Sequence, residues 1–106
     1  MNFDEYQRFT KKTAIYPKIG KSFVYPALGL AGESGEVLEK IKKIFRDQKG
    51  RLTQENRQGI KKELGDILWY VSQLSTEFGF KLSEVAEENV EKLKSRVKRD
   101  TLHGNG

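Results

Sequence analysis

Apolar residues recur every three or four positions along most of the chain, and they never alternate strictly with polar residues over the length of a strand. This spacing is typical of amphipathic helices and predicts an all-α protein. The expected helices span about residues 2–13, 26–45, 54–78 and 84–98.

Residues that favour helix ends divide these segments. Pro26 suits the first turn of the second helix. We expect Thr53 to cap the third helix, Gly79 to end it and Ser83 to cap the fourth. Gly50 lies in the turn between the second and third helices, and a turn of this length makes those two helices antiparallel.

Length and composition limit what the chain can be. Its 106 residues fit one domain, residues 1–106, and a domain this small gains from association, so we expect a homo-oligomer. There are no cysteines, so any metal must be bound through oxygen. The N-terminus is charged where a signal peptide is apolar, and no apolar run is as long as a membrane span. We therefore expect a cytoplasmic protein with no membrane partner.

Two pairs of acidic residues stand out by their position on the predicted helices. Glu33 and Glu36 lie about 60° and 120° to one side of the apolar stripe of the second helix, and Glu63 and Asp66 lie at the same angles on the third. In antiparallel helices the two margins meet on one side, with residue 33 level with residue 66 and residue 36 level with residue 63. Four carboxylates that converge beside a core repel one another unless a cation neutralises them.

The acidic residues alone leave two interpretations open. A hard divalent cation such as Mg²⁺ prefers oxygen ligands and usually keeps positions for water and substrate phosphates, which would suit hydrolysis. Alternatively, Lys40, on the same margin as Glu33 and Glu36, and nearby lysines neutralise the acids in a salt-bridged hairpin. The net charge of +5 does not separate nucleotide enzymes from nucleic-acid binders, because the partners of both are anionic.

Longer motifs surround these acidic pairs. The chain contains LGLAGESGEVLEKIKKIFRD, then KKELGDILWYVSQL, then ENVEKLKSR and finally TLHGNG. In order and separation, from about Phe3 to the end, these motifs resemble the MazG-like nucleotide pyrophosphohydrolases. The family commonly continues past such a tail, whereas this chain stops at Gly106, and we do not expect His103 to be a catalyst.

The resemblance implies an α-helical bundle with a four-helix core completed by oligomerisation, as a homodimer or homotetramer. It implies hydrolysis of nucleoside triphosphates, including non-canonical or deoxy forms, to monophosphate and pyrophosphate by attack of water at the α-phosphorus. The cofactor would be Mg²⁺, with Mn²⁺ as a substitute. The implied catalytic and metal-binding residues are Glu33, Glu36, Glu63 and Asp66, and the implied substrate contacts are Tyr70, Asn89, Lys92 and Arg96.

Two other functions fit parts of the sequence. One is a phosphoribosyl-ATP pyrophosphohydrolase, which belongs to a related all-α family. The other is a helical oligomer that binds nucleic acid or a protein partner through basic segments such as Lys98 and Arg99. Neither a helix-turn-helix nor an aromatic stacking platform is apparent, so nucleic acid is not the expected partner.

Trp69 lies on the outer side of the third helix, about 180° from the centre of its apolar stripe. We expect it to pack against another subunit, or against an end helix that a subunit contact holds in place. Gly65, on the same side, would let another helix approach closely. The alternative is that the first or fourth helix of the same chain covers Trp69.

Overall fold

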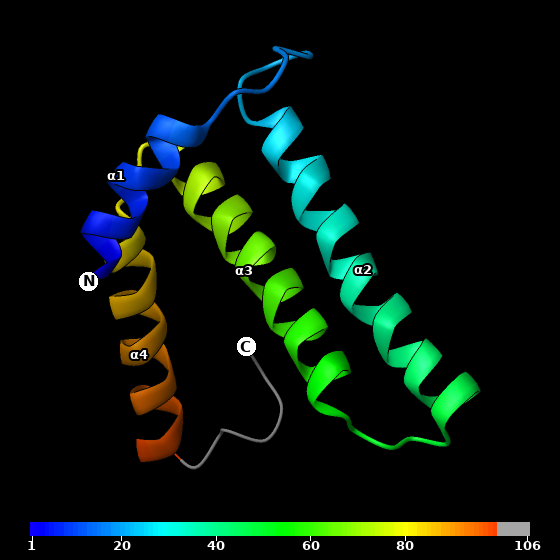
Figure 1. Ribbon diagram of the computed structural model, residues 1–106. Coiled ribbons are helices and arrows are strands. Elements are labelled where there is room, and N and C mark those ends of the chain that lie inside the picture. Colours follow the sequence, from blue (N-terminus) through cyan, green and yellow to red (C-terminus); the bar gives the residue numbers. More distant parts are fainter. Residues whose placement is uncertain (100–106) are drawn as a thin grey trace.

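The computed structural model describes residues 1–99, which form four α-helices and no strand. They are α1 (Phe3–Thr13), α2 (Val24–Gln48), α3 (Gln54–Glu77) and α4 (Leu82–Lys98) (Figure 1). The predicted all-α fold is confirmed. The motif TLHGNG, including His103, lies outside the described residues.

Helices α2 and α3 form the antiparallel pair that the sequence predicts (Figure 1). Lys49 and Gly50 both adopt left-handed backbone conformations, with φ of 55° and 79°, and the Gly50 N–H donates to the carbonyl oxygen of Ile44 at 3.1 Å. Thr53 caps α3 as predicted, because its hydroxyl accepts a hydrogen bond from the N–H of Asn56 at 3.1 Å. The turn therefore fixes the register of the two long helices.

The predicted cap of the fourth helix is wrong. Helix α4 begins at Leu82, with Lys81 in the capping position, and the Ser83 hydroxyl donates instead to Asp4 of α1 at 2.8 Å. The Leu82 N–H, which would otherwise lack a partner at the helix start, donates to Gln7 of α1 at 2.8 Å. A contact with a distant helix thus sets the boundary.

Polar side chains of α1 form hydrogen bonds with α3, with the start of α4 and with the segment that joins these two helices. The buried Gln7 amide donates to the Thr76 hydroxyl at 3.0 Å and to the Phe80 carbonyl at 2.9 Å. The buried hydroxyls of Thr10 and Ser72 lie 2.9 Å apart in a further hydrogen bond. Since these groups are satisfied inside the protein, they anchor α1 specifically rather than merely by apolar contact.

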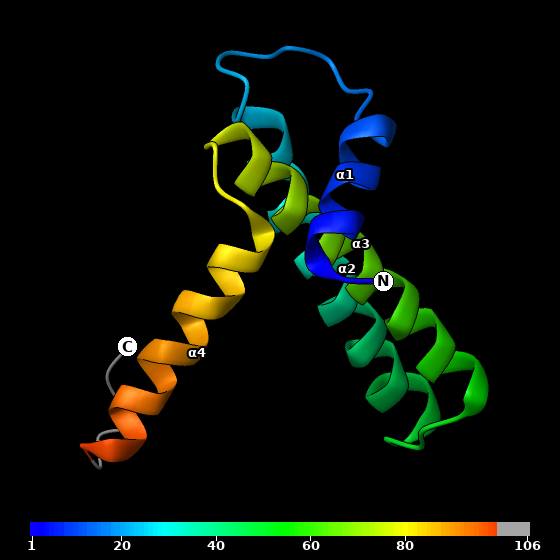
Figure 2. The ribbon, with the colours of Figure 1, turned by 90° about the vertical axis from the view of Figure 1, so that its left-hand side faces the viewer.

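The molecule is open rather than compact. Helix α4 diverges from the α2–α3 pair (Figure 2), and the radius of gyration is 16.7 Å, against about 13 Å for a compact chain of this length. Within residues 1–99 the buried hydrophobic residues are Ile44 and Leu82. Large apolar side chains remain exposed on all four helices, namely Phe3, Phe9, Leu28, Leu38, Ile41, Phe45, Leu64, Leu68, Val85, Val90, Leu93 and Val97.

Trp69 is partly covered by its own chain. Its indole N–H donates to the Thr13 hydroxyl at the end of α1 at 2.9 Å, and its ring meets Tyr16 edge to face with centroids 6.4 Å apart. This contact agrees with the alternative in which the first helix of the same chain covers Trp69. A Cβ on Gly65 would meet no atom of the described chain within 4 Å, so no helix of residues 1–99 approaches that glycine.

None of the helices in residues 1–99 is both long enough and apolar enough to cross a membrane.

Candidate metal centre

Three of the four predicted carboxylates converge between α2 and α3. Oxygens of Glu33, Glu63 and Asp66 all lie within 4.8 Å of one another. Glu33 and Glu63 are half-buried and Asp66 is exposed. The antiparallel pairing brings residue 33 of α2 beside residues 63 and 66 of α3. The matching acidic margins also predict that residue 36 joins the group at the level of residue 63, and Glu36 is not part of it.

The electrostatics of this group favour a cation. A hydrogen bond shared with Glu63 raises the pKa of Glu33 above its usual value, and burial and the negative charges of Asp66 and Glu36 raise it further. A raised carboxyl pKa beside other carboxylates is a sign of uncompensated negative charge. A cation at this point would remove that penalty.

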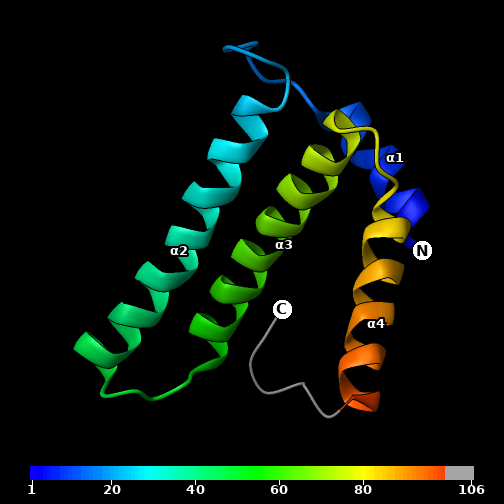
Figure 3. The same cartoon turned by 180° about the vertical axis from the view of Figure 1, so that it is seen from behind.

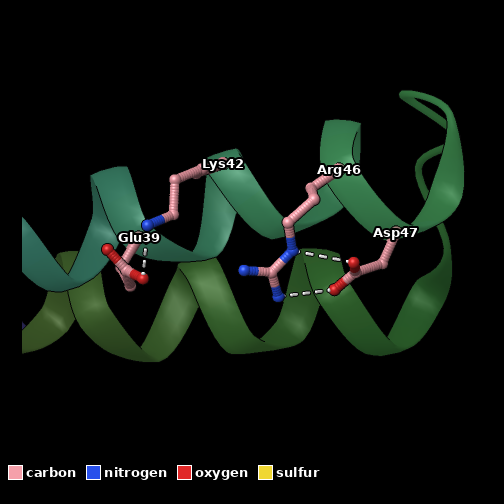
Figure 4. Close-up of polar contacts among 4 residues, drawn as sticks. All are labelled: Glu39, Lys42, Arg46 and Asp47. Atoms are coloured by element: carbon pink, nitrogen blue, oxygen red, sulfur yellow. Dashed lines mark hydrogen bonds and ion pairs between the residues drawn. The ribbon is translucent and has the colours of Figure 1, made fainter.

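Glu36 lies at the edge of the site rather than inside the three-carboxylate group. It is exposed on α2, one turn after Glu33, and acts on Glu33 through its charge. Glu39, one further turn along, is different. It forms an ion pair with Lys42 at 2.9 Å on the surface of α2 (Figure 4), and a hydrogen bond from that lysine lowers the pKa of Glu39.

The same picture includes a second surface pair. Arg46 donates two hydrogen bonds to Asp47, at 2.8 and 2.9 Å (Figure 4). These pairs neutralise acids toward the end of α2 locally, so they leave no negative charge for a metal there. The contrast with Glu33 distinguishes the candidate centre from acidic residues of similar spacing.

Lys40 reaches from α2 toward the candidate centre. Its ammonium lies 3.7 Å from Glu63, and its methylene groups lie over Gly59 of α3. The alternative in which lysines neutralise the acids of the hairpin therefore holds for one pair, Lys40 and Glu63. One lysine offsets one of three carboxylates, which leaves a negative site that still suits a divalent cation.

Tyr70 lies one turn beyond Asp66, with its ring over the backbone of Gly29 on α2. Burial raises the pKa of Tyr70, and the charges of Tyr25, Glu33 and Asp66 raise it further, so its hydroxyl belongs to the same electrostatic environment as the carboxylates. The sequence predicts Tyr70 as a substrate contact, which stays a prediction, and sequence reasoning missed the contact of its ring with Gly29. The signal was a glycine in the interior of a helix, where it is unfavourable without a packing reason.

The other predicted substrate contacts do not meet the carboxylates in this chain. Asn89, Lys92 and Arg96 all lie on α4, whose C-terminal half is separate from α3 in views from opposite sides (Figures 1 and 3). Asn89 and Lys92 are exposed and Arg96 is half-buried. The single chain thus separates the basic stripe from the acidic group.

The donor set can hold a hard cation. Two ligands of one Mg²⁺ are at most about 4.2 Å apart, so oxygens within 4.8 Å of one another need only small side-chain adjustments to share an ion. All the donors are carboxylate oxygens, as such ions prefer. Fold and site together define an all-helical protein with an acidic group on an antiparallel helix pair, and the donor atoms of this group are of the kind that suits a divalent cation.

Comparison with known proteins identifies the family within this class. Residues 26–100 match the family model described as the MazG nucleotide pyrophosphohydrolase domain, and the chain belongs to this family. It is therefore a nucleotide pyrophosphohydrolase, of a family that generally depends on divalent metals. The chain is also 44% identical over 111 residues to the Gene 37 protein of Mycobacterium phage L5, an alignment that covers 100% of this chain and 97% of that protein. No solved structure matches the chain significantly.

Proposed function

We propose that this protein is a single-domain enzyme of the cytoplasm that hydrolyses nucleoside triphosphates, including deoxy or non-canonical forms, to monophosphate and pyrophosphate with Mg²⁺. The convergence of Glu33, Glu63 and Asp66 carries this proposal. Membership of the MazG nucleotide pyrophosphohydrolase family supports it.

In this proposal Glu33, Glu63 and Asp66 hold Mg²⁺, and Glu36 completes the ligand set from the edge of the site. Bound Mg²⁺ would neutralise the triphosphate and lower the pKa of a coordinated water. Mn²⁺, which takes the same oxygen ligands, would substitute. The raised pKa of Glu33 supports this assignment, because it comes from the hydrogen bond shared with Glu63, from burial and from the neighbouring carboxylates, whose repulsion a cation there would relieve.

Substrate binding would come from two sides. Tyr70 lies next to the carboxylates and would contact the nucleoside. Asn89, Lys92 and Arg96 would contact nucleoside and phosphates, since an amide and two cations on one helix face suit a phosphate chain. Helix α4 diverges from the acidic centre within one chain, so we propose that assembly into a homodimer or homotetramer brings this stripe to the site.

The exposed apolar faces support assembly. Leu38, Ile41 and Phe45 of α2 and Leu64 of α3 remain exposed on the helix pair that carries the candidate centre. Extended apolar surface of this kind is unusual on a monomer and typical of an interface. A second copy of the chain would supply a complementary surface of the same composition.

Replacing Glu63 by glutamine tests the metal assignment. The amide keeps the shape but loses the charge that binds the cation, so we expect turnover of nucleoside triphosphates to fall about 1000-fold or more. Mg²⁺ should also no longer raise the melting temperature of this variant. Activity assays and thermal melts with and without Mg²⁺ measure both effects.

Glu39→Gln is the matched control, because Glu39 is paired with Lys42 outside the centre and should be dispensable. Near-normal turnover of Glu63→Gln would contradict the metal assignment. Separation of the products tests the site of attack, since diphosphate and phosphate would exclude attack at the α-phosphorus.

A further inference from the structure

Lys40 forms an ion pair with Glu63 that is too long for a hydrogen bond. Its ammonium nitrogen lies 3.7 Å from a carboxylate oxygen of Glu63, whereas Lys42 and Glu39, on the surface of α2, are 2.9 Å apart. The Lys40 side chain is 39% exposed, and an ion pair that is both long and partly exposed contributes little to stability. Lys40 therefore lies beside the acidic centre and can leave its carboxylate at small cost.

The stem of Lys40 crosses α3 at a glycine. Two of its carbons lie 3.7 and 3.9 Å from the point where a Cβ on Gly59 would be, which is ordinary van der Waals distance. Because glycine has no side chain, the stem lies over α3 without being wedged in place. The four-carbon stem of a lysine is flexible, so the ammonium can swing away from Glu63 while the backbone of α2 stays where it is.

Three features follow one another along the α2–α3 pair. Tyr70 lies over Gly29, and the carboxylates of the acidic centre come next. Lys40 follows Glu33 by seven residues, which places it about 10.5 Å further along α2 and only about 20° around the helix. A nucleoside triphosphate has its groups in a matching order, with the nucleoside at one end and the terminal phosphates at the other. If Tyr70 contacts the nucleoside, as proposed, the terminal phosphates extend toward Lys40.

Open space continues beyond Lys40 toward the turn. A cavity of about 350 Å³ lies between positions 40 to 48 of α2 and positions 53 to 59 at the start of α3, and Lys43 lines it together with Lys40. The walls also contain two acids. Asp47 is neutralised by two hydrogen bonds from Arg46, and the exposed Glu55 lies in the first turn of α3, where the helix dipole offsets its charge. The cavity leaves room for phosphate groups next to Lys40.

The acidic centre needs a further cation when a nucleotide binds. A triphosphate carries more negative charge than one Mg²⁺ neutralises, and the carboxylates add to that charge. The basic stripe of α4 is separate from the centre within one chain (Figures 1 and 3), whereas Lys40 is already beside it. A divalent cation on Glu63 would also repel the Lys40 ammonium, so the two compete for this carboxylate.

We propose that Lys40 binds the terminal phosphates of the nucleotide, the part that leaves as pyrophosphate. Its ammonium pairs with Glu63 in the metal-free protein and moves to these phosphates when a divalent cation occupies the carboxylates. The proposal rests on the proposed function, because the nucleotide must bind with its α-phosphate at the acidic centre. Lys40 is then a substrate-binding residue, and its pair with Glu63 belongs to the metal-free protein.

The first measurement uses Mg²⁺ alone. Lys40→Met keeps the length of the stem and removes the charge. In calorimetric titrations we expect Mg²⁺ to bind this variant about 3-fold more tightly than the parent, because no ammonium competes for Glu63. Lys42→Met is the matched control, since Lys42 pairs with Glu39 outside the centre, and it should bind Mg²⁺ as the parent does.

The second measurement uses pyrophosphate with Mg²⁺ at saturation. Lys40→Met should bind pyrophosphate about 10-fold more weakly than the parent, because a charge-assisted contact is lost. A nucleoside monophosphate, which lacks the terminal phosphates, should bind both proteins equally. Lys40→Arg keeps the charge and should bind pyrophosphate within about 3-fold of the parent. A pair that only stabilised the hairpin would lower the melting temperature of Lys40→Met and leave pyrophosphate binding unchanged.

Both changes are required by the proposal. A Lys40→Met variant with the parent affinity for Mg²⁺, or with the parent affinity for pyrophosphate, would overturn it. Lys40→Gln gives the same comparison if Lys40→Met does not fold.

The outcomes separate the two proposals. A parent that hydrolyses no nucleoside triphosphate would refute the proposed function and the role of Lys40 together. An active parent that depends on Glu63, with parent-like pyrophosphate binding in Lys40→Met, would refute the role of Lys40 alone.

Discussion

Gly29 positions Tyr70 by lacking a side chain. A Cβ built on Gly29 would overlap the Tyr70 ring, so the ring can lie across α2 only because this position is glycine. Glycine in a helix interior is less favourable than alanine by about 1 kcal/mol. The placement of Tyr70 beside the carboxylates therefore has a structural requirement on the opposite helix.

Gly29→Ala should displace the Tyr70 ring and lower kcat/KM about 10-fold, while the helix content stays that of the parent. Steady-state kinetics and circular dichroism measure the two effects. Gly32→Ala, where a Cβ meets no atom within 4 Å, should instead raise the melting temperature through helix propensity alone. Parent-like kinetics in Gly29→Ala would show that the position of Tyr70 does not matter for the reaction.

Glu33 makes the stability of the metal-free protein depend on pH. Its folded-state pKa is raised, so the folded protein holds a proton that the unfolded chain has released, over the window from the ordinary pKa of a glutamate up to the raised value. Stability therefore falls as the pH rises through this window.

In EDTA at neutral pH, Glu33→Gln should melt above the parent, because the repulsion among the carboxylates is reduced. This difference should shrink as the pH falls toward the ordinary pKa of glutamate, where the parent carboxyl is protonated. Thermal melts between pH 4.5 and pH 8 measure it, with Glu39→Gln as the control. A difference that is constant with pH would contradict the role of Glu33.

Sequence reasoning brought Glu33, Glu63 and Asp66 together because two simple regularities fix their positions, namely helix periodicity and the antiparallel turn, whereas Glu36 does not join them. It did not predict the hydrogen bonds of Gln73, because they depend on Tyr16 of a loop and on the contact of Tyr16 with Glu77 of α3. Irregular loops have no periodicity from which side-chain positions follow. Gly29 was missed for a related reason, since its partner lies on another helix.

At the scale of whole elements, helix existence was predicted better than helix ends. Thr53 caps α3 as expected because the cap is local and its partner is three residues away. Ser83 fails as a cap because Asp4 and Gln7, nearly 80 residues earlier, bind the start of α4. A capping residue in the sequence therefore predicts a helix start correctly only where no distant residue binds the same end of the helix.

The turn between α2 and α3 requires glycine at position 50, which predicts that a side chain there lowers stability. Gly50 has φ of 79°, and a Cβ there would lie 2.8 Å from the Phe45 ring. Gly50→Ala should therefore lower the free energy of unfolding by about 1 to 2 kcal/mol. Urea denaturation measures this change.

Gly59→Ala is the control for the turn variant. Its Cβ would make only ordinary contact, at 3.7 Å, with the Lys40 side chain, and its helical backbone accepts alanine. This variant should be as stable as the parent or more so. A parent-like stability of Gly50→Ala would mean that the turn tolerates a side chain.

At the scale of the whole molecule, the acidic centre and the basic stripe are held apart. Helix α4 leaves the α2–α3 pair and carries Lys92 and Arg96 with it (Figure 2). If assembly joins the two parts, each site contains residues from two chains. Two inactive variants, one in each part, should then complement each other.

Co-expression of Glu63→Gln with Lys92→Ala should restore about a quarter of the parent activity in a dimer, since half of randomly formed dimers are mixed and each mixed dimer has one intact site. Each variant alone should be strongly impaired. Activity assays on the mixed and separate preparations, with light scattering to establish assembly, measure this. Mixed preparations no more active than the separate ones would place each site within one chain.

The small number of buried hydrophobic residues in residues 1–99 would link the activity of the enzyme to the amount of protein in the cell. If the chain assembles as proposed, a core that contains little more than Ile44 and Leu82 within residues 1–99 would gain much of its stability from association, and the folded fraction would depend on protomer concentration by mass action. Dilution would then remove both the fold and the shared site. Enzyme activity in the cell would rise more steeply than the amount of protein, so a modest change in expression would act as a threshold.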